Sequence, residues 1–305
     1  MSNVITAIDK SGSYRVYLAI TTDMVKTAAE IHNTTPVCTA ALGRVLTGAG
    51  LMGLMLKNED DKLTVLFKGD GPAKQVLATA NRRGTVKGYV ANPDVELPLN
   101  KFGKLDVGGA IGVGELTVIK DLGLKDPYIG NIALVDGEVA DDLTAYYYIS
   151  EQQNTAISLG VKVDRDYSVK AAGGMFIQML PSPVEESIDE LEKMLADLPP
   201  ITTLIEEVVE KNPLLTEDAL LEKLLYRIFG KMKEEYTVTV MGREELKWDC
   251  DCSKEKLERA LITIGVKDLT EIYEEDRQAE LTCQFCLKKY LFNEEELKSM
   301  LERIR

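Results

Sequence analysis

Histidine is almost absent from the chain, and this limits the metal sites it can build. Its one histidine, His32, lies far from four of its five cysteines, which fall in the last fifth as Cys250-Asp-Cys252 and Cys283-Gln-Phe-Cys286. Two close pairs of cysteines separated by a loop are a typical ligand set for tetrahedral zinc. With no histidine nearby, we expect one zinc ion per chain, held by these four thiolates alone.

An excess of positive charge is also lacking. The 305 residues include 36 Lys and Arg against 50 Asp and Glu, a net charge of −14. Binding to nucleic acid needs a basic patch that neutralises phosphates, so no nucleic-acid partner is expected. The glycines between 108 and 114 do not follow G-x-G-x-x-G, and G-x-x-x-x-G-K-[ST] occurs nowhere. Turns and close packing explain these glycines better than a nucleotide site, and nothing indicates an ATPase.

Targeting and membrane signals are weak. Residues 1–12 lack a basic stretch followed by an apolar one, so no signal peptide is expected. Residues 36–56 form an apolar run about long enough to span a membrane, but the charged Arg44 lies near its middle. They predict a buried helix of a soluble core, with Cys38 as a small core residue. Four cysteines paired as metal ligands, plus one more, fit a reducing compartment, so a cytoplasmic protein without a membrane partner is expected.

Residues 1–181 predict an α+β domain with a largely antiparallel sheet and packed helices. Apolar runs bounded by turn residues predict strands at 14–20, 63–68, 86–91, 116–120 and 175–180. Apolar residues at helical spacing predict helices at 23–33, 36–57 and 141–151.

Residues 182–248 predict an amphipathic helical linker broken by prolines. Ser182-Pro-Val-Glu185 has the pattern of a capping box, which predicts a helix start there. Residues 184–249 hold 17 Asp and Glu against 8 Lys and Arg. Such short helices are marginal alone, so their apolar faces must pack on something. A helical subdomain with a fixed interface and a linker that docks only when the C-terminal unit is folded both remain open.

Residues 249–305 predict a small C-terminal zinc domain with helices at 254–264, 267–276 and 294–304. A unit of this size commonly needs a metal or disulfides to fold. Zinc binding to four thiolates is worth about 10–16 kcal/mol in small peptides, comparable to the stability of a whole domain. Removing the metal should therefore unfold this unit.

The spacing of the cysteines also permits redox chemistry. Only Asp251 separates the first pair, which can ligate one metal or close a small disulfide ring. Cys283 and Cys286 have the C-x-x-C spacing of redox-active dithiols. A purely structural zinc site and a dithiol switch therefore both remain open on spacing alone.

The cysteine pattern resembles that of the heat shock protein 33 family of redox-regulated bacterial chaperones. Similar motifs run in family order through nearly the whole chain: Gly103-Lys-Leu-Asp-Val-Gly-Gly109, Lys120-Asp-Leu-Gly-Leu-Lys125, Asp141-Asp-Leu-Thr144, Ser150-Glu-Gln152, Ala171-Ala-Gly-Gly174 and Glu274-Glu-Asp276.

The resemblance implies a function. It implies a stress-response chaperone, not an enzyme, that binds unfolded client proteins without ATP, prevents their aggregation and so assists refolding. It further implies that the reduced, zinc-bound form is inactive. Oxidation would form Cys250–Cys252 and Cys283–Cys286 disulfides, release zinc and activate the protein as a homodimer.

Two alternatives come from other functional classes. A thiol–disulfide oxidoreductase would use Cys283 and Cys286 in a thioredoxin-like context, which 270–295 does not show. A zinc-ribbon module that binds RNA or a protein would place basic and aromatic residues beside the zinc. Residues 253–305 instead mix 10 basic with 12 acidic residues.

Overall fold

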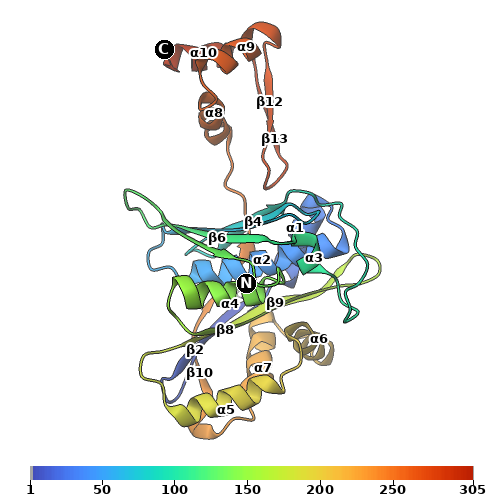
Figure 1. The fold of residues 1–305 in the computed structure, drawn as a ribbon, viewed down its shortest axis with the longest axis vertical. Coiled ribbons are helices and arrows are strands. Elements are labelled where there is room, and N and C mark those ends of the chain that lie inside the picture. Colours follow the sequence, from blue (N-terminus) through green and yellow to red (C-terminus); the bar gives the residue numbers. More distant parts are fainter. Residues whose placement is uncertain (1–2, 305) are drawn as a thin grey trace. The chain divides into compact units, whose positions relative to one another are not determined.

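The structure, a computed structural model, describes residues 3–304 and divides the chain into two compact units (Figure 1). The first unit extends to Trp248, and the second begins at Asp249. The predicted α+β fold with largely antiparallel sheets is confirmed. The finer division into 1–181, 182–248 and 249–305 stays a prediction.

The first unit contains two sheets, and the strands pair antiparallel except for β11 with β5. The first sheet has the order β10-β1-β2-β9-β8, with β1 Val4–Asp9, β2 Tyr14–Ile20, β8 Thr155–Val163, β9 Val169–Met179 and β10 Val238–Glu244. The second sheet has the order β11-β5-β4-β3-β6-β7, with β3 Lys62–Gly69, β4 Gln75–Asn81, β5 Thr85–Val90, β6 Gly114–Asp121, β7 Tyr128–Ala133 and β11 Lys247–Trp248.

Helix α2 (Pro36–Leu54) lies between the two sheets and is buried almost all round (Figure 1). It is long and apolar enough to cross a membrane, but 94% of its apolar window is buried inside the first unit. The predicted core helix is therefore confirmed. Cys38, near its start, is fully buried, and its thiol lies 3.4 Å from the carbonyl oxygen of Asn92.

Three other helices complete this core, α1 (Thr22–His32), α3 (Val107–Ile111) and α4 (Ala140–Ser150). The glycines between 108 and 114 serve close packing, as predicted. Gly112 has φ +80°, and a Cβ on Gly114 would lie 1.9 Å from the carbonyl oxygen of Lys68. Only glycine fits where these two backbones meet.

Helices α5 (Glu185–Ala196), α6 (Ile201–Lys211) and α7 (Glu217–Phe229) cover the outer face of the first sheet (Figure 1). Their apolar stripes bury side chains such as Leu191, Leu204 and Leu221 against Ile5 and Ile177 of the sheet. This packing supplies the partner that short amphipathic helices need, and it leaves their acidic faces in water.

Two details of the predicted linker differ from the structure. The capping box is wrong: α5 begins at Glu185 after Val184, while Ser182 adopts φ +58°. The backbone N–H of Val184 donates instead to Ser13 Oγ at 2.9 Å, so a tertiary contact fixes the helix start. The last part of the segment forms the edge strands β10 and β11 instead of helix. Edge strands have few buried residues, so their sequence pattern is weak.

The second unit packs α8 (Lys254–Ile262), α9 (Val266–Glu275) and α10 (Glu294–Ile304) on a hairpin of β12 (Ala279–Thr282) and β13 (Lys289–Phe292). All three helices were predicted, but the hairpin was not. Its core is small and centres on Leu269, Phe292 and Leu297.

Residues 245–248, here called the exit segment, are fastened firmly to the first unit. The side-chain amide of Asn3 donates to the Leu246 carbonyl at 2.9 Å and accepts from the Leu246 N–H at 2.7 Å. The N–H of Lys247 donates to the Gly84 carbonyl at 3.0 Å. The Trp248 ring meets the His32 ring edge-on, with centroids 6.0 Å apart.

The exit segment can be tested at Gly84, which has φ +78° and whose ideal Cβ would lie 1.9 Å from the Glu245 carbonyl oxygen. We expect Gly84→Ala to lower the free energy of unfolding of the first unit by about 2–4 kcal/mol, from backbone strain and this clash. Urea unfolding followed by Trp248 fluorescence measures it. Gly12→Ala is the control: Gly12 has φ +74° and an open surrounding, so about 1 kcal/mol is expected. An equal loss of unfolding free energy in both variants would contradict the close approach of Gly84 to the Glu245 carbonyl oxygen.

Candidate metal centre

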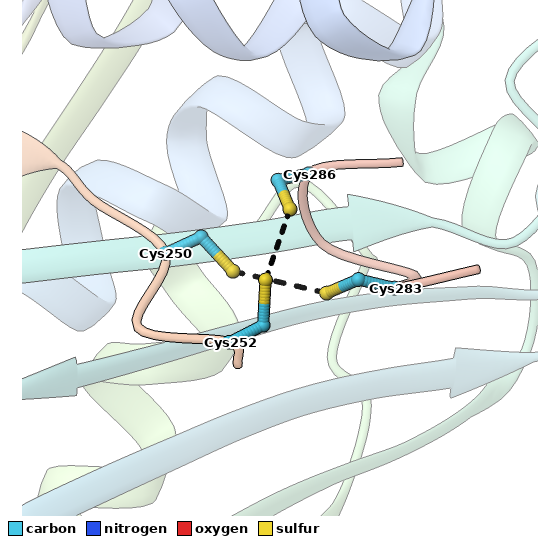
Figure 2. A group of neighbouring side chains, drawn as sticks. All are labelled: Cys250, Cys252, Cys283 and Cys286. Atoms are coloured by element: carbon cyan, nitrogen blue, oxygen red, sulfur yellow. Dashed lines mark hydrogen bonds between the residues drawn. The ribbon is translucent and has the colours of Figure 1, made fainter. Parts of the chain in front are cut away.

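The structure brings all four predicted ligand cysteines together at one point of the second unit (Figure 2). Cys250 and Cys252 lie on the extended segment before α8, and Cys283 and Cys286 lie in the turn between β12 and β13. Their four Sγ atoms are all within 4.8 Å of one another. The Sγ atoms of Cys250 and Cys283 are 3.8 Å apart, and those of Cys252 and Cys286 are 3.3 Å apart.

The hairpin turn positions the second pair. The N–H of Cys283 donates to the Lys288 carbonyl at 3.0 Å and closes the β12–β13 ladder. The N–H of Leu287 donates back to the Cys283 carbonyl at 2.8 Å, and Leu287 adopts φ +58°. This left-handed residue returns the chain to β13. Figure 2 shows the thiols of Cys283 and Cys286 directed toward those of Cys250 and Cys252.

The first pair is positioned by Ser253 and Tyr290. Ser253 caps α8, with its Oγ accepting from the Lys256 N–H at 3.3 Å, directly after Cys252. The hydroxyl of Tyr290, a buried residue of β13, donates to the Cys252 carbonyl at 3.2 Å and lies 3.2 Å from the Cys252 Sγ. Tyr290 therefore joins the two halves of the site. The sequence does not indicate this role for Tyr290, because its partner Cys252 is 38 residues away.

The thiols differ in how readily they ionise. Burial raises the pKa of Cys250 and of Cys286 above the usual value. Burial also opposes ionisation of Cys252, but hydrogen bonds from the Tyr290 hydroxyl and from neighbouring thiols outweigh it and lower its pKa to about 7. Like charges this close repel one another, so each further thiolate beside that of Cys252 is unfavourable. Four thiolates at this point require a metal ion that offsets part of their charge.

The donor set fits zinc. A tetrahedron with metal–sulfur bonds of about 2.3 Å has edges of about 3.8 Å, close to the sulfur separations found here. Thiolates are soft ligands that suit zinc, and all four positions of the tetrahedron are filled by the protein, as in structural zinc sites. Two of the nearby lysines are already paired, Lys254 with Glu296 at 2.5 Å and Lys289 with Glu280 at 2.7 Å, while Lys288 lies over the Tyr290 ring. The four cysteines could thus hold one metal ion, with zinc compatible.

Comparison with known proteins gives one consistent family. A model of the Hsp33 protein family matches residues 2–293. The 33 kDa chaperonin of Clostridium tetani is 48% identical over 299 residues, which cover 98% of this chain and 97% of that protein. The one from Alkaliphilus oremlandii is 47% identical over 304 residues, covering 99% and 97%. The crystal structure of the 33 kDa chaperonin (heat shock protein 33 homolog) from Thermotoga maritima matches with a TM-score of 0.82 at 36% identity, covering 99% of each chain.

Removing one ligand tests the metal centre. We expect Cys283→Ser to lose zinc and to unfold the second unit, because three thiolates leave the site incomplete and the core of this unit is small. Metal analysis and circular dichroism on the purified protein measure both effects. Cys38→Ala, which removes a buried thiol far from the site in sequence, should keep one zinc per chain. Full zinc occupancy in the Cys283→Ser protein would rule out this ligand set.

Tyr290→Phe tests the residue that holds Cys252. The ring keeps its packing, but the hydroxyl contacts with the Sγ and the carbonyl of Cys252 are lost. We expect zinc affinity to fall by about tenfold, as for other residues that orient a metal ligand. Competition with a chromogenic chelator measures the affinity. Tyr273→Phe, which changes a half-buried tyrosine of the same unit, should leave it unchanged.

Proposed function

The chain belongs to the Hsp33 family, and from this membership we propose that it is a redox-regulated, ATP-independent chaperone. It would hold unfolding proteins and prevent their aggregation under oxidative stress. The family supports a chaperone in general, and the relatives from Clostridium tetani and Alkaliphilus oremlandii are named 33 kDa chaperonins. The observation that carries the redox part of the proposal is the convergence of four oxidisable thiols within a unit that has a small core.

In the reduced state, Cys250, Cys252, Cys283 and Cys286 would hold one zinc ion, which, when bound, would offset part of the charge of the thiolates and keep the unit folded. Oxidation by a peroxide would join Cys250 to Cys252 and Cys283 to Cys286. Each pair of thiolates would give up two electrons to one hydrogen peroxide, which takes up two protons from the solvent and becomes two waters.

The pairing itself rests on the family resemblance. The Sγ atoms of Cys252 and Cys286, 3.3 Å apart, belong to different pairs, and all four Sγ atoms lie within 4.8 Å of one another. Short spacing along the chain favours neighbours once the unit unfolds, since small loops close at the least entropic cost.

Helices α5–α7 are the proposed responsive element. Their apolar stripes and the sheet face beneath them are buried only against each other. The second unit begins directly after the exit segment, so its unfolding would act on the end of the same stretch of chain. Release of the helices would expose two complementary apolar surfaces of the kind that unfolded clients bind.

The remaining properties follow from the same proposal. Thiols that must be reduced at rest support a cytoplasmic location. Its partners would be unfolded clients and, in the active state, a second copy of the chain, with no nucleic-acid or membrane partner. The hairpin position of Cys283 gives no support to an oxidoreductase, because redox-active C-x-x-C motifs typically begin a helix whose dipole activates the thiolate.

An aggregation assay tests this function. A thermally unfolding protein such as citrate synthase is followed by light scattering without ATP, with either the reduced, zinc-loaded protein or the peroxide-treated protein. We expect the oxidised form to suppress scattering at near-equimolar ratio and the reduced form to have little effect. A protein in which Cys250, Cys252, Cys283 and Cys286 are all changed to Ser controls for effects of peroxide elsewhere and should not respond to it. Equal suppression by reduced and oxidised wild-type protein would contradict redox control.

A further inference from the structure

A small pocket between α6 and α7 gathers positive charge on an otherwise acidic protein. Its volume is about 330 Å³, and its lining includes Lys211, Lys223, Arg227 and Lys231, with Glu207 as the one carboxylate. These are four of the eight basic residues in 184–249, a stretch with 17 acidic residues. We call this site the basic pocket.

The charge of the basic pocket is largely unneutralised. Arg227 pairs with Glu207 at 3.3 Å. Among the residues that the structure describes, Lys211, Lys223 and Lys231 are in no salt bridge. Like charges brought together repel one another, so their convergence is unfavourable without an anion.

Helix dipoles explain only part of this arrangement. Lys211 and Arg227 lie in the last turns of α6 and α7, where a cation is stabilised by the helix C-terminus. Lys223 lies in the middle of α7, facing the same pocket, and gains nothing from this effect.

One further feature suits a ligand larger than a single ion. Tyr226 lines the basic pocket and is 76% exposed, so it offers a ring face and a hydroxyl group. A second pocket, of about 310 Å³, adjoins it between α5 and α7 and shares Arg227 and Lys231; its other charged residues are Lys193, Glu190 and Asp197. The two carboxylates offset Lys193, so the cations available to an anion are mainly those of the basic pocket itself.

We propose that the basic pocket binds an anion that carries two or more linked phosphate groups. Ammonium groups on flexible stems suit phosphate oxygens, and a diphosphate carries enough negative charge to match three uncompensated lysines. Such a ligand would join α6 to α7 and so stabilise the docked helices. This last consequence rests on the proposed function, whereas binding itself does not.

Calorimetric titration of the full-length, reduced, zinc-loaded protein with pyrophosphate, ADP and sulfate, without magnesium, tests the site. We expect pyrophosphate and ADP to bind at least tenfold more tightly than sulfate, and more weakly at high salt. Equal binding of pyrophosphate and ADP would assign recognition to the diphosphate group alone. Tighter binding of ADP would add a contact between its ring and Tyr226, and Tyr226→Ala should then remove only that advantage.

Charge-matched variants locate the binding. Lys223→Gln should weaken pyrophosphate binding about tenfold, since one charge-assisted contact is lost. Lys26→Gln, at an exposed position of α1, removes the same charge elsewhere and should leave binding unchanged. Zinc content and melting temperature verify that both variants are folded. No binding of either phosphate, equal affinity for sulfate, or an equal loss in the Lys26 variant would overturn the proposal. The aggregation assay, run without phosphate, would be unaffected by that failure.

Discussion

Repulsion among four sulfurs is the constraint on which the second unit depends. Cys250, Cys252, Cys283 and Cys286 are held within 4.8 Å of one another, and they can all be thiolates only if a cation lies between them. The unit around them has little else to stabilise it, with a core that centres on Leu269 and a few neighbours. The stability of this unit is therefore coupled to the protonation state of its cysteines. Under the proposed function, such a unit would respond to oxidants more readily than a larger domain, because its ligands would be its main source of stability.

The first unit has the opposite character. Helix α2 is enclosed by two sheets, and the core around it is large and apolar. Helices α5–α7 have neither the large core of the first unit nor the cysteine cluster of the second. They are short, their outer faces are acidic, and their stability comes from one apolar interface with the first sheet. Under the proposed function, a stable core, a conditional layer of helices and a metal-dependent unit would follow one another along the chain. After the helices, the exit segment returns the chain to the core, where Asn3 and Gly84 hold it before the second unit begins.

Features set by local periodicity or spacing were predictable from sequence. Helix α2 follows from its apolar length, and the paired cysteines predicted which side chains meet. Features that depend on distant partners were not predictable. Strand β10 is recognisable only once β1 lies beside it, and the start of α5 is set by Ser13, far away in sequence. Tyr290 was missed for the same reason, since its contact with Cys252 exists only when the hairpin and the segment before α8 are folded together. The basic pocket likewise combines residues of two helices that packing brings into register.

The central claim is that loss of the metal releases α5–α7 while the core around α2 stays folded. Amide hydrogen exchange measured by mass spectrometry, on the reduced, zinc-loaded protein and on the peroxide-treated protein, tests it most directly, because exchange reports the opening of each element separately. The account predicts that oxidation removes protection from residues 249–304 and from α5–α7, and leaves α2 and β9 protected. Unchanged protection of α5–α7 after zinc has been released would contradict it, and these helices would then be a fixed part of the first unit.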